Sequence, residues 1–269
     1  METEQEHIAR ELREHDTLAE GAPSWLVNKP DEYNPTARDA ENFMLRQMLA
    51  RRTFIEEGGD GPARSVLFVG GGSGMEAEPF ARAGYDVSVS DLSPNILRCA
   101  EQRFRERGLA AKEFFTANAQ ALALENDAYD IGIAYEALHH VPQPLESLRE
   151  LARVSARGII IVEPFTSPLF DALSRLGLAH RKEYSGLIPY RFKREEMDDI
   201  LRECGFESYR LTLVLRFPDD FLPKAWRDSA RFSRLYLRIM GLARFFPALG
   251  NQGILVARKP AKIVETKAR

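Results

Sequence analysis

Cysteine is scarce in this sequence, and so are long apolar runs and any strong excess of one charge. Two cysteines in 269 residues, Cys99 and Cys204, are too few for a disulfide framework or a thiolate metal site, so we expect small buried side chains. A formal net charge of −3 leaves no basic footprint for nucleic acid. No apolar stretch approaches the roughly 20 residues that cross a bilayer.

The start of the chain is acidic where a secretory leader would be basic and then apolar. Met1 is followed by Glu2, Glu4 and Glu6. We therefore expect a cytoplasmic protein with no integral membrane segment.

From Arg64 onward the chain alternates short apolar runs with helix-like segments. This alternation predicts a parallel sheet covered on both faces, a Rossmann-like, doubly wound α/β fold. The expected strands are 65–70, 85–91, 112–118, 129–135 and 157–164, and the helices between them are 75–84, 94–107 and 144–154. After a helix over 193–205, strands at 208–217 and 251–260 predict an antiparallel pair that ends the sheet.

The segments added to this core divide the chain. Residues 1–62 are expected to form a helical cap with helices at about 3–19 and 36–57, and residues 63–269 the core. Two insertions, 165–192 and 218–250, are expected to form the acceptor pocket or an oligomer face.

The run "VLFVGGGSG", Val66 to Gly74, places four glycines in five residues directly after the first strand. Such a turn lets the backbone approach a nucleotide-like ligand, whereas a packing turn needs only one or two glycines. Gly72-x-Gly74-x-x-Ala77 fits the loose dinucleotide pattern. However, the strand ends at Val69, and in the register that begins at Gly70 the sixth position is Met75.

Two polar positions follow at the ends of the next strands. Asp91 ends the second strand, where a carboxylate can accept both hydroxyl protons of a ribose. Asn118 and Ala119 end the third strand and can offer an amide and an N–H to an adenine edge.

Together these motifs resemble the class I S-adenosylmethionine-dependent methyltransferases, and most closely the methyltransferase type 11 group. The matching segments are "VLFVGGGSG", "VSVSDLSPNIL", "ANAQAL", "YDIGIAYEALHHVPQP" and "LRELARVSARGIIIVEP". The resemblance implies a seven-stranded sheet with an antiparallel last strand, and S-adenosylmethionine as the cofactor. It places Gly70, Gly71, Gly72 and Gly74 by the methionine part, Asp91 on the ribose, Leu92 on the adenine, and Asn118 and Ala119 at the adenine edge.

One departure from the family concerns the cofactor's ammonium group. The family usually has an acidic residue two positions before the first glycine, and here that residue is Phe68; Asn118 likewise replaces a common aspartate. Glu76 and Glu136 are the candidates for holding the ammonium. Two other readings stay open, a nicotinamide-dependent oxidoreductase and a binding module that no longer turns over.

The fourth strand ends "AYEALHHVP", which brings Tyr135 to His140 beside the glycine turn. Methyl transfer depends on aligning the acceptor, and a hydroxyl or ammonium acceptor must also lose a proton. His139 and His140 are candidate bases because histidine titrates near neutrality. Tyr135, and Tyr33 from the amino-terminal segment, could turn a ring toward the sulfonium.

Glu136, His139 and His140 also share one face of a helical turn, a spacing that suits a divalent ion. The ubiquinone-biosynthesis O-methyltransferases are similar here, with glutamate-x-x-glutamate-histidine. No fourth ligand is visible, so we expect no metal.

The acceptor is expected to be a small molecule of unknown identity, methylated on O, N or C. The first insertion offers Glu183, Tyr184, Tyr190 and Arg191, and the second mixes arginines with aromatic side chains. The second insertion fits a helix pair covering the sheet, a hydrophobic roof, a homodimer face or a membrane-docking surface. Residues 25–35 carry Trp25, Leu26, Val27 and Tyr33, and are expected to fold over the cofactor as a lid.

Overall fold

The computed structural model describes residues 3–58, 61–176, 189–216 and 222–261. Its centre is a seven-stranded sheet in the order β3-β2-β1-β4-β5-β7-β6. The strands are β1 (Ser65–Val69), β2 (Asp86–Asp91), β3 (Glu113–Thr116), β4 (Tyr129–Tyr135), β5 (Ser155–Pro164), β6 (Ser208–Val214) and β7 (Gln252–Arg258). β7 runs antiparallel to both β5 and β6. The predicted doubly wound sheet with an antiparallel last strand is therefore confirmed.

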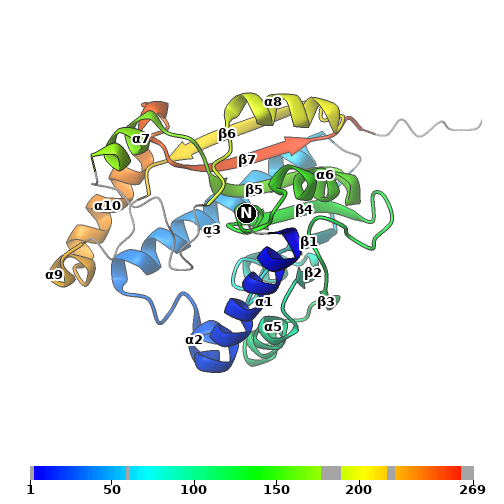
Figure 1. Cartoon of the computed structure of the whole chain (residues 1–269), viewed down its shortest axis with the longest axis horizontal. Helices are drawn as coiled ribbons and strands as arrows, with labels where there is room; N and C mark the ends of the chain where they lie inside the picture. Colours follow the sequence, from blue (N-terminus) through cyan, green and yellow to red (C-terminus); the bar gives the residue numbers. More distant parts are fainter. Residues whose placement is uncertain (1–2, 59–60, 177–188, 217–221, 262–269) are drawn as a thin grey trace, which may run out of the picture.

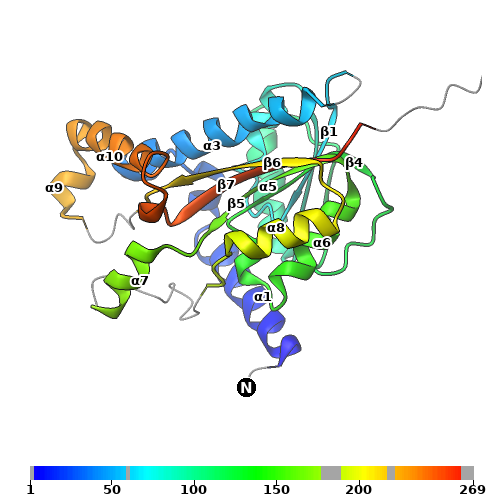
Figure 2. The ribbon, with the colours of Figure 1, turned by 90° about the horizontal axis from the view of Figure 1, so that it is seen from above.

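Helices cover both faces of the sheet, as the alternation of apolar residues requires (Figures 1 and 2). In β1, Val66 and Phe68 belong to one apolar cluster and Leu67 and Val69 to the other, because successive side chains of a strand point to opposite faces. The first cluster takes in α3 (Pro35–Glu56), α4 (Glu78–Arg82), α5 (Pro94–Glu106) and α10 (Ala230–Leu242). The second takes in α6 (Pro144–Val154) and α8 (Arg194–Glu203).

The strand order reverses direction at β1. β2 and β3 lie on one side of β1 and β4 and β5 on the other. In an open parallel sheet this switch point leaves a crevice beyond the carboxyl ends of the strands, where ligands bind. The turn after β1 and the segment after β4 both open onto that crevice.

The amino-terminal segment contains three helices where two were expected. α1 (Glu4–Gly21) and α3 match the predicted helices, but the proline-rich stretch between them contains α2 (Pro23–Asn28). Pro23 stands in the first turn of α2, where a missing N–H costs nothing. α4 is shorter than predicted, since Pro79 in its first turn has no N–H to donate and restricts the residue before it.

A buried arginine ties this segment to the core. Arg103 of α5 is 1% exposed, and its guanidinium donates to the carbonyls of Val27 (2.9 Å), Leu26 (3.4 Å) and Lys29. Its Nε donates to Glu78 at 3.0 Å. The stretch after α2 is therefore anchored to α5 and α4.

Further helices lie in the described parts of the two insertions. The first holds α7 (Pro168–Arg175), and the second holds α9 (Lys224–Arg227), α10 and the short η3 (Pro247–Leu249). α10 packs against α3, and the Thr36 hydroxyl donates to the carbonyl of Arg227 at 2.8 Å. In the part of the chain that the structure describes, no helix is long and apolar enough to cross a membrane.

Candidate functional site

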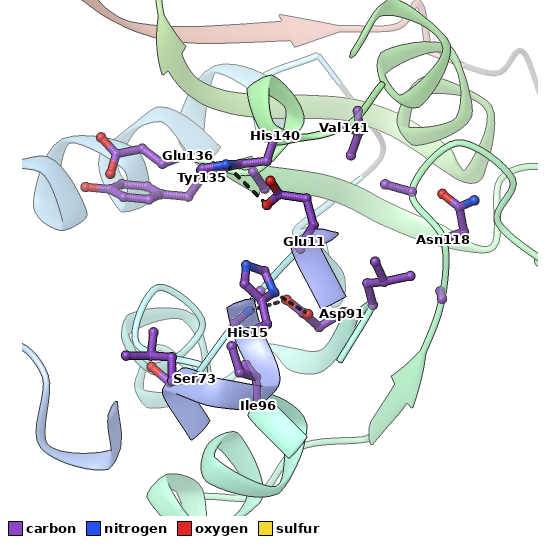
Figure 3. Close-up of a pocket in the computed structure, with 18 of the residues that line it drawn as sticks. Glu11, His15, Ser73, Asp91, Ile96, Asn118, Tyr135, Glu136, His140 and Val141 are labelled. Atoms are coloured by element: carbon purple, nitrogen blue, oxygen red, sulfur yellow. Dashed lines mark hydrogen bonds and ion pairs between the residues drawn. The ribbon is translucent and has the colours of Figure 1, made fainter. Parts of the chain in front are cut away.

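A pocket lies at the carboxyl ends of β1, β2 and β4, with α1 along one side (Figure 3). It brings together most of the residues that the sequence placed at a cofactor site. Its lining is His7, Ile8, Glu11, His15, Leu18, Leu26, Lys29, Gly70, Gly71, Gly72, Ser73, Glu76, Asp91, Leu92, Ile96, Ala117, Asn118, Ala119, Tyr135, Glu136, Ala137, His140, Val141 and Pro142. Of the predicted site residues, Gly74 and His139 are not among them.

The glycine turn is built from residues in left-handed conformations. Gly70 and Gly72 have φ of 63° and 50°, where a side chain is strained. A Cβ on Gly70 would lie 2.6 Å from the Cβ of Ala137. The lack of a side chain at Gly70 therefore also lets the turn pack closely against the segment after β4. A Cβ on Gly74 would instead meet Phe104 and Ala100 of α5. Gly74 therefore packs the turn on a helix.

Asp91 ends β2 with a carboxylate that is 3% exposed and faces the pocket. One oxygen, Oδ2, accepts the N–H of Gly72 at 2.9 Å, and the other, Oδ1, accepts the N–H of Ser93 at 3.0 Å. Because a carboxylate has about four acceptor sites, two remain, for which a ligand and His15 can compete. His15 of α1 approaches from the pocket, with Nδ1 3.5 Å from Oδ1.

The next stretch of the lining follows β2 and β3. Leu92 and Ile96 supply apolar surface, and Asn118 and Ala119 also line the pocket. The side-chain oxygen of Asn118 accepts the N–H of Gln120 at 3.0 Å, which leaves its amide nitrogen as the donor toward a ligand.

Phe68 and Glu76, both considered for the acidic position beside the glycine turn, have different surroundings. Phe68 is buried in the core against the ring of Phe80, with centroids 5.4 Å apart, and does not line the pocket. Glu76 does line it, and burial, with repulsion from Glu41, raises its pKa to about 7. Burial also lowers the pKa of nearby Lys29. The pocket thus contains a carboxyl group whose charge is incompletely compensated.

The Tyr135 hydroxyl is already engaged. It donates to Glu41 of α3, and Arg216 bridges Glu41 (2.9 Å) and Glu136 (2.6 Å). Burial and the Glu41 charge raise the pKa of Tyr135 well above its usual value, so the phenol stays protonated at neutral pH. Glu136 has φ of 48°, a strained conformation for a non-glycine residue, which turns its side chain toward Arg216.

The two predicted histidines have different surroundings. His139 is 8% exposed and outside the pocket lining; its Nδ1 lies 2.6 Å from Glu163, which also accepts the N–H groups of Ala137 and Leu138. His140 lines the pocket, and its Nδ1 lies 3.6 Å from Glu11 of α1. His140 is therefore the histidine that a pocket ligand can reach.

The side chains of the candidate metal motif diverge. Glu136 contacts Arg216, His139 contacts Glu163, and His140 contacts Glu11. In the described ranges of the chain, no group of three or more His, Cys, Asp or Glu side chains could hold a metal ion.

The sequence reasoning missed the polar face of α1. His7, Glu11 and His15 are spaced four residues apart on one face, and all three line the pocket. Figure 3 shows Glu11 and His15 pointing into it. His7 Nε2 lies 2.7 Å from the carbonyl oxygen of His140. Glu11 is 6% exposed, burial raises its pKa, and among the described residues its Oε1 has no hydrogen-bond partner. Charged residues at this spacing usually mark a solvated helix face, so only tertiary structure reveals their role.

Residues 25–35 contribute to the pocket, but through other side chains than the expected Tyr33. Tyr33 does not line the pocket; its ring packs against Trp25 with centroids 6.0 Å apart. Leu26 and Lys29 from the same segment line it instead.

Neither insertion supplies a described residue to this pocket. The Tyr190 hydroxyl bonds Glu196 at 2.7 Å, and Arg191 stacks on Phe170. The predicted Glu183 and Tyr184 lie outside the described residues.

Residues 67–162 match the family model of a methyltransferase domain. The chain is 30% identical over 181 residues to the ubiquinone biosynthesis O-methyltransferase of Caulobacter vibrioides, covering 60% of this chain and 71% of that one. It is 31% identical over 121 residues to the demethylmenaquinone methyltransferase of Renibacterium salmoninarum, covering 45% of this chain and only 49% of that relative.

A solved structure is similar in fold over a larger share of this chain than these two sequence relatives cover. Magnesium protoporphyrin IX methyltransferase from Synechocystis PCC 6803 with bound SAH has a TM-score of 0.61 and 17% identity, and the match covers 93% of this chain and 99% of that one. At this identity the likeness concerns the fold alone.

Proposed function

The chain belongs to the class I S-adenosylmethionine-dependent methyltransferases, and from that premise we propose that it methylates a small-molecule acceptor. In this proposal Asp91 binds the cofactor and His140 is the base that accepts the acceptor's proton. The observation that carries the proposal is Asp91, a buried carboxylate at the sheet's switch point that faces the pocket beside a left-handed glycine turn.

The residues present fit this cofactor at both of its ends. The two acceptor sites left on Asp91 suit the two hydroxyl protons of a ribose. Leu92 would pack on the adenine, and Asn118 with Ala119 would meet its edge. Glu76 would pair with the α-ammonium, which supplies the positive charge that this carboxyl group lacks.

When bound, the cofactor supplies a methyl group activated by a sulfonium. The chain's own contribution is to align the acceptor and remove its proton. His140 faces the pocket, and Glu11 stands 3.6 Å from its Nδ1, where a carboxylate stabilises the imidazolium formed when the ring accepts a proton. Tyr135 shapes the pocket while its hydroxyl stays on Glu41. His139 positions the segment after β4 through Glu163.

We assign α1 the role of a lid over this pocket, with residues 63–269 as the catalytic core. Three side chains of α1 reach the residues proposed to bind cofactor or take the proton. A helix in that position excludes water from the reacting groups.

The acceptor class follows from the relatives. One is named a ubiquinone biosynthesis O-methyltransferase and the other a demethylmenaquinone methyltransferase. We therefore propose an electron-rich ring carrying hydroxyl groups, methylated on oxygen or carbon. Either reaction releases the proton of an acidic hydroxyl or ring carbon, which His140 can accept.

The first experiment is binding: calorimetric titration with S-adenosylhomocysteine and with NAD, where only the former should bind. The second incubates the protein with S-adenosylmethionine and a set of demethylated quinols and catechols, and follows the added CH₂ by mass. Absence of S-adenosylhomocysteine binding would refute the cofactor assignment. Binding without methylation of any of these acceptors would refute the acceptor class and leave the cofactor site intact.

A further inference from the structure

Most of the exposed large apolar side chains in the described part of the chain lie in one segment, from α9 to just before η3. Five of the seven fall there: Trp226, Leu235, Leu242, Phe245 and Phe246. Phe245 and Phe246 are 65% and 59% exposed. Single exposed apolar residues are ordinary, but a concentration of this kind marks an interaction surface.

The same segment is strongly basic within an acidic chain. Residues 222–250 contain Lys224, Arg227, Arg231, Arg234, Arg238 and Arg244 but only one acidic residue, Asp228, a net charge of +5, whereas the whole chain carries −3. The segment therefore concentrates positive charge where the apolar side chains are exposed.

On α10 the two kinds of side chain share one face. Arg231, Arg234, Leu235, Arg238 and Leu242 are all exposed and recur at helical spacing. The opposite face, Ser233, Tyr236 and Met240, is buried and packs toward α3. Folding thus accounts for the inner face of α10 and leaves the outer face unexplained.

The charges on this outer face are not neutralised within the described residues. Among the described residues, no ion pair joins a carboxylate to Arg231, Arg234 or Arg238. α9 and α10 lie together at one end of the molecule, away from α6, in both views (Figures 1 and 2). A broad external surface can therefore reach them.

We propose that residues 224–246, the α9–α10 surface, dock the protein on an anionic lipid bilayer. Arginines on an amphipathic helix bind anionic headgroups, and tryptophan, leucine and phenylalanine side chains enter the interface below them. A second copy of this chain fits poorly, because a two-fold interface would set one +5 surface against another. A nucleic acid would leave the leucines and phenylalanines without apolar partners.

The first test is co-sedimentation of the full chain with vesicles. Vesicles of phosphatidylcholine plus about a third phosphatidylglycerol should bind the protein, and vesicles of phosphatidylcholine alone should bind it much less. Each basic side chain near an anionic surface contributes roughly fivefold to affinity. The triple variant Arg231→Glu, Arg234→Glu and Arg238→Glu should therefore bind more than about 100-fold more weakly.

A matched control separates the surface from net charge. Arg98→Glu, Arg105→Glu and Arg202→Glu change three exposed arginines on α5 and α8 and alter the net charge equally. This control should keep vesicle binding. Both triple variants should keep the thermal transition and S-adenosylhomocysteine binding of the unaltered protein, since none of the six side chains is buried or lines the pocket.

Tryptophan fluorescence tests insertion directly. The chain has two tryptophans, Trp25 and Trp226, so Trp25→Phe leaves Trp226 as the single probe. The emission of Trp226 should shift to shorter wavelength when anionic vesicles are added. Raised salt screens the electrostatic part of vesicle binding, and the double variant Phe245→Ser and Phe246→Ser should weaken the apolar part that remains.

Three results would overturn the proposal. One is equal binding of the α10 triple variant and its control. Another is a Trp226 emission unchanged by vesicles. The third is a different partner that the α10 triple variant loses. A concentration-dependent doubling of mass that this variant abolishes would assign the surface to a second copy, and tight binding of a DNA duplex that it abolishes would assign the surface to nucleic acid.

Discussion

Glu76→Gln tests how the pocket holds a positively charged ligand. The pKa of Glu76 is raised to about 7, first by burial and then by Glu41. In the free protein this carboxyl group is therefore about nine-tenths ionised at pH 8 and about one-tenth ionised at pH 6. A ligand ammonium pairs only with the ionised form, so affinity should rise as the pH increases through 7.

The expected magnitude follows from these fractions. S-adenosylhomocysteine should bind about tenfold more weakly at pH 6 than at pH 8, which is about 1.4 kcal/mol. Glu76→Gln should remove this part of the pH dependence, and at pH 8 it should weaken binding by about 10- to 150-fold, the range for a hydrogen bond between charged groups.

Two controls isolate the ammonium contact. 5′-Methylthioadenosine has the adenosine but no amino acid, so its affinity should be the same for Glu76→Gln and the unaltered protein. Glu101→Gln changes an exposed carboxylate of α5 and should change nothing. Calorimetry at pH 6, 7 and 8 measures all of these affinities. An S-adenosylhomocysteine affinity that is level across this range, or a slope that persists in Glu76→Gln, would refute the reasoning.

Further predictions concern the other residues of the pocket. Asp91→Ala should weaken S-adenosylhomocysteine by at least about 10-fold, because charge-assisted bonds to the ribose are lost; an unchanged dissociation constant would exclude the ribose assignment. His140→Gln should lower kcat by about 10²–10⁴-fold with little change in cofactor affinity, and a kcat near that of the unaltered protein would leave positioning as the source of rate. Burial lowers the pKa of His15, but the hydrogen bond and charge of Asp91 outweigh burial and raise it, so protonated His15 holds α1 on Asp91 more firmly as the pH falls. His15→Gln should therefore strengthen 5′-methylthioadenosine binding at pH 6 more than at pH 8, and equal effects at both pH values would contradict this linkage.

Local patterns predicted the core of the fold well. β4 matches the expected strand residue for residue, and α5 begins after Ser93, whose side chain accepts the N–H of Ile96. These elements are specified by an apolar run or by a capping residue, both of which act within a few positions. α2 was missed because Pro23 and the later Pro30 were interpreted as turn signals, although a proline in the first turn of a helix, as Pro23 is, favours a helix start.

The pocket was predictable only where its residues follow a strand. Asp91 and the glycine turn lie at strand ends, so the sheet brings them together. Glu11 and His15 come from a helix about 80 residues earlier in the sequence, and no local pattern directs that helix to β2. His139 and His140 are adjacent in sequence, yet the buried Glu163 holds one of them outside the pocket lining.

The buried guanidinium of Arg103 has a consequence for how fast ligands exchange. It holds the carbonyls that end α2, so α2 is fixed to α5, while α1 joins it through Ala22, which provides no side-chain cap for α2. α1, about 27 Å long, is itself held on α5 by the hydrogen bond from Ser93 to Asp16 and by the buried Ala19, so a swing around Ala22 must break these contacts while the rest of the segment stays in place. If that swing precedes entry, the observed association rate of S-adenosylhomocysteine should level off at high ligand concentration, at the opening rate of the arm. A disulfide between α1 and α5 would then slow entry and escape together, and the equilibrium affinity would change far less than either rate.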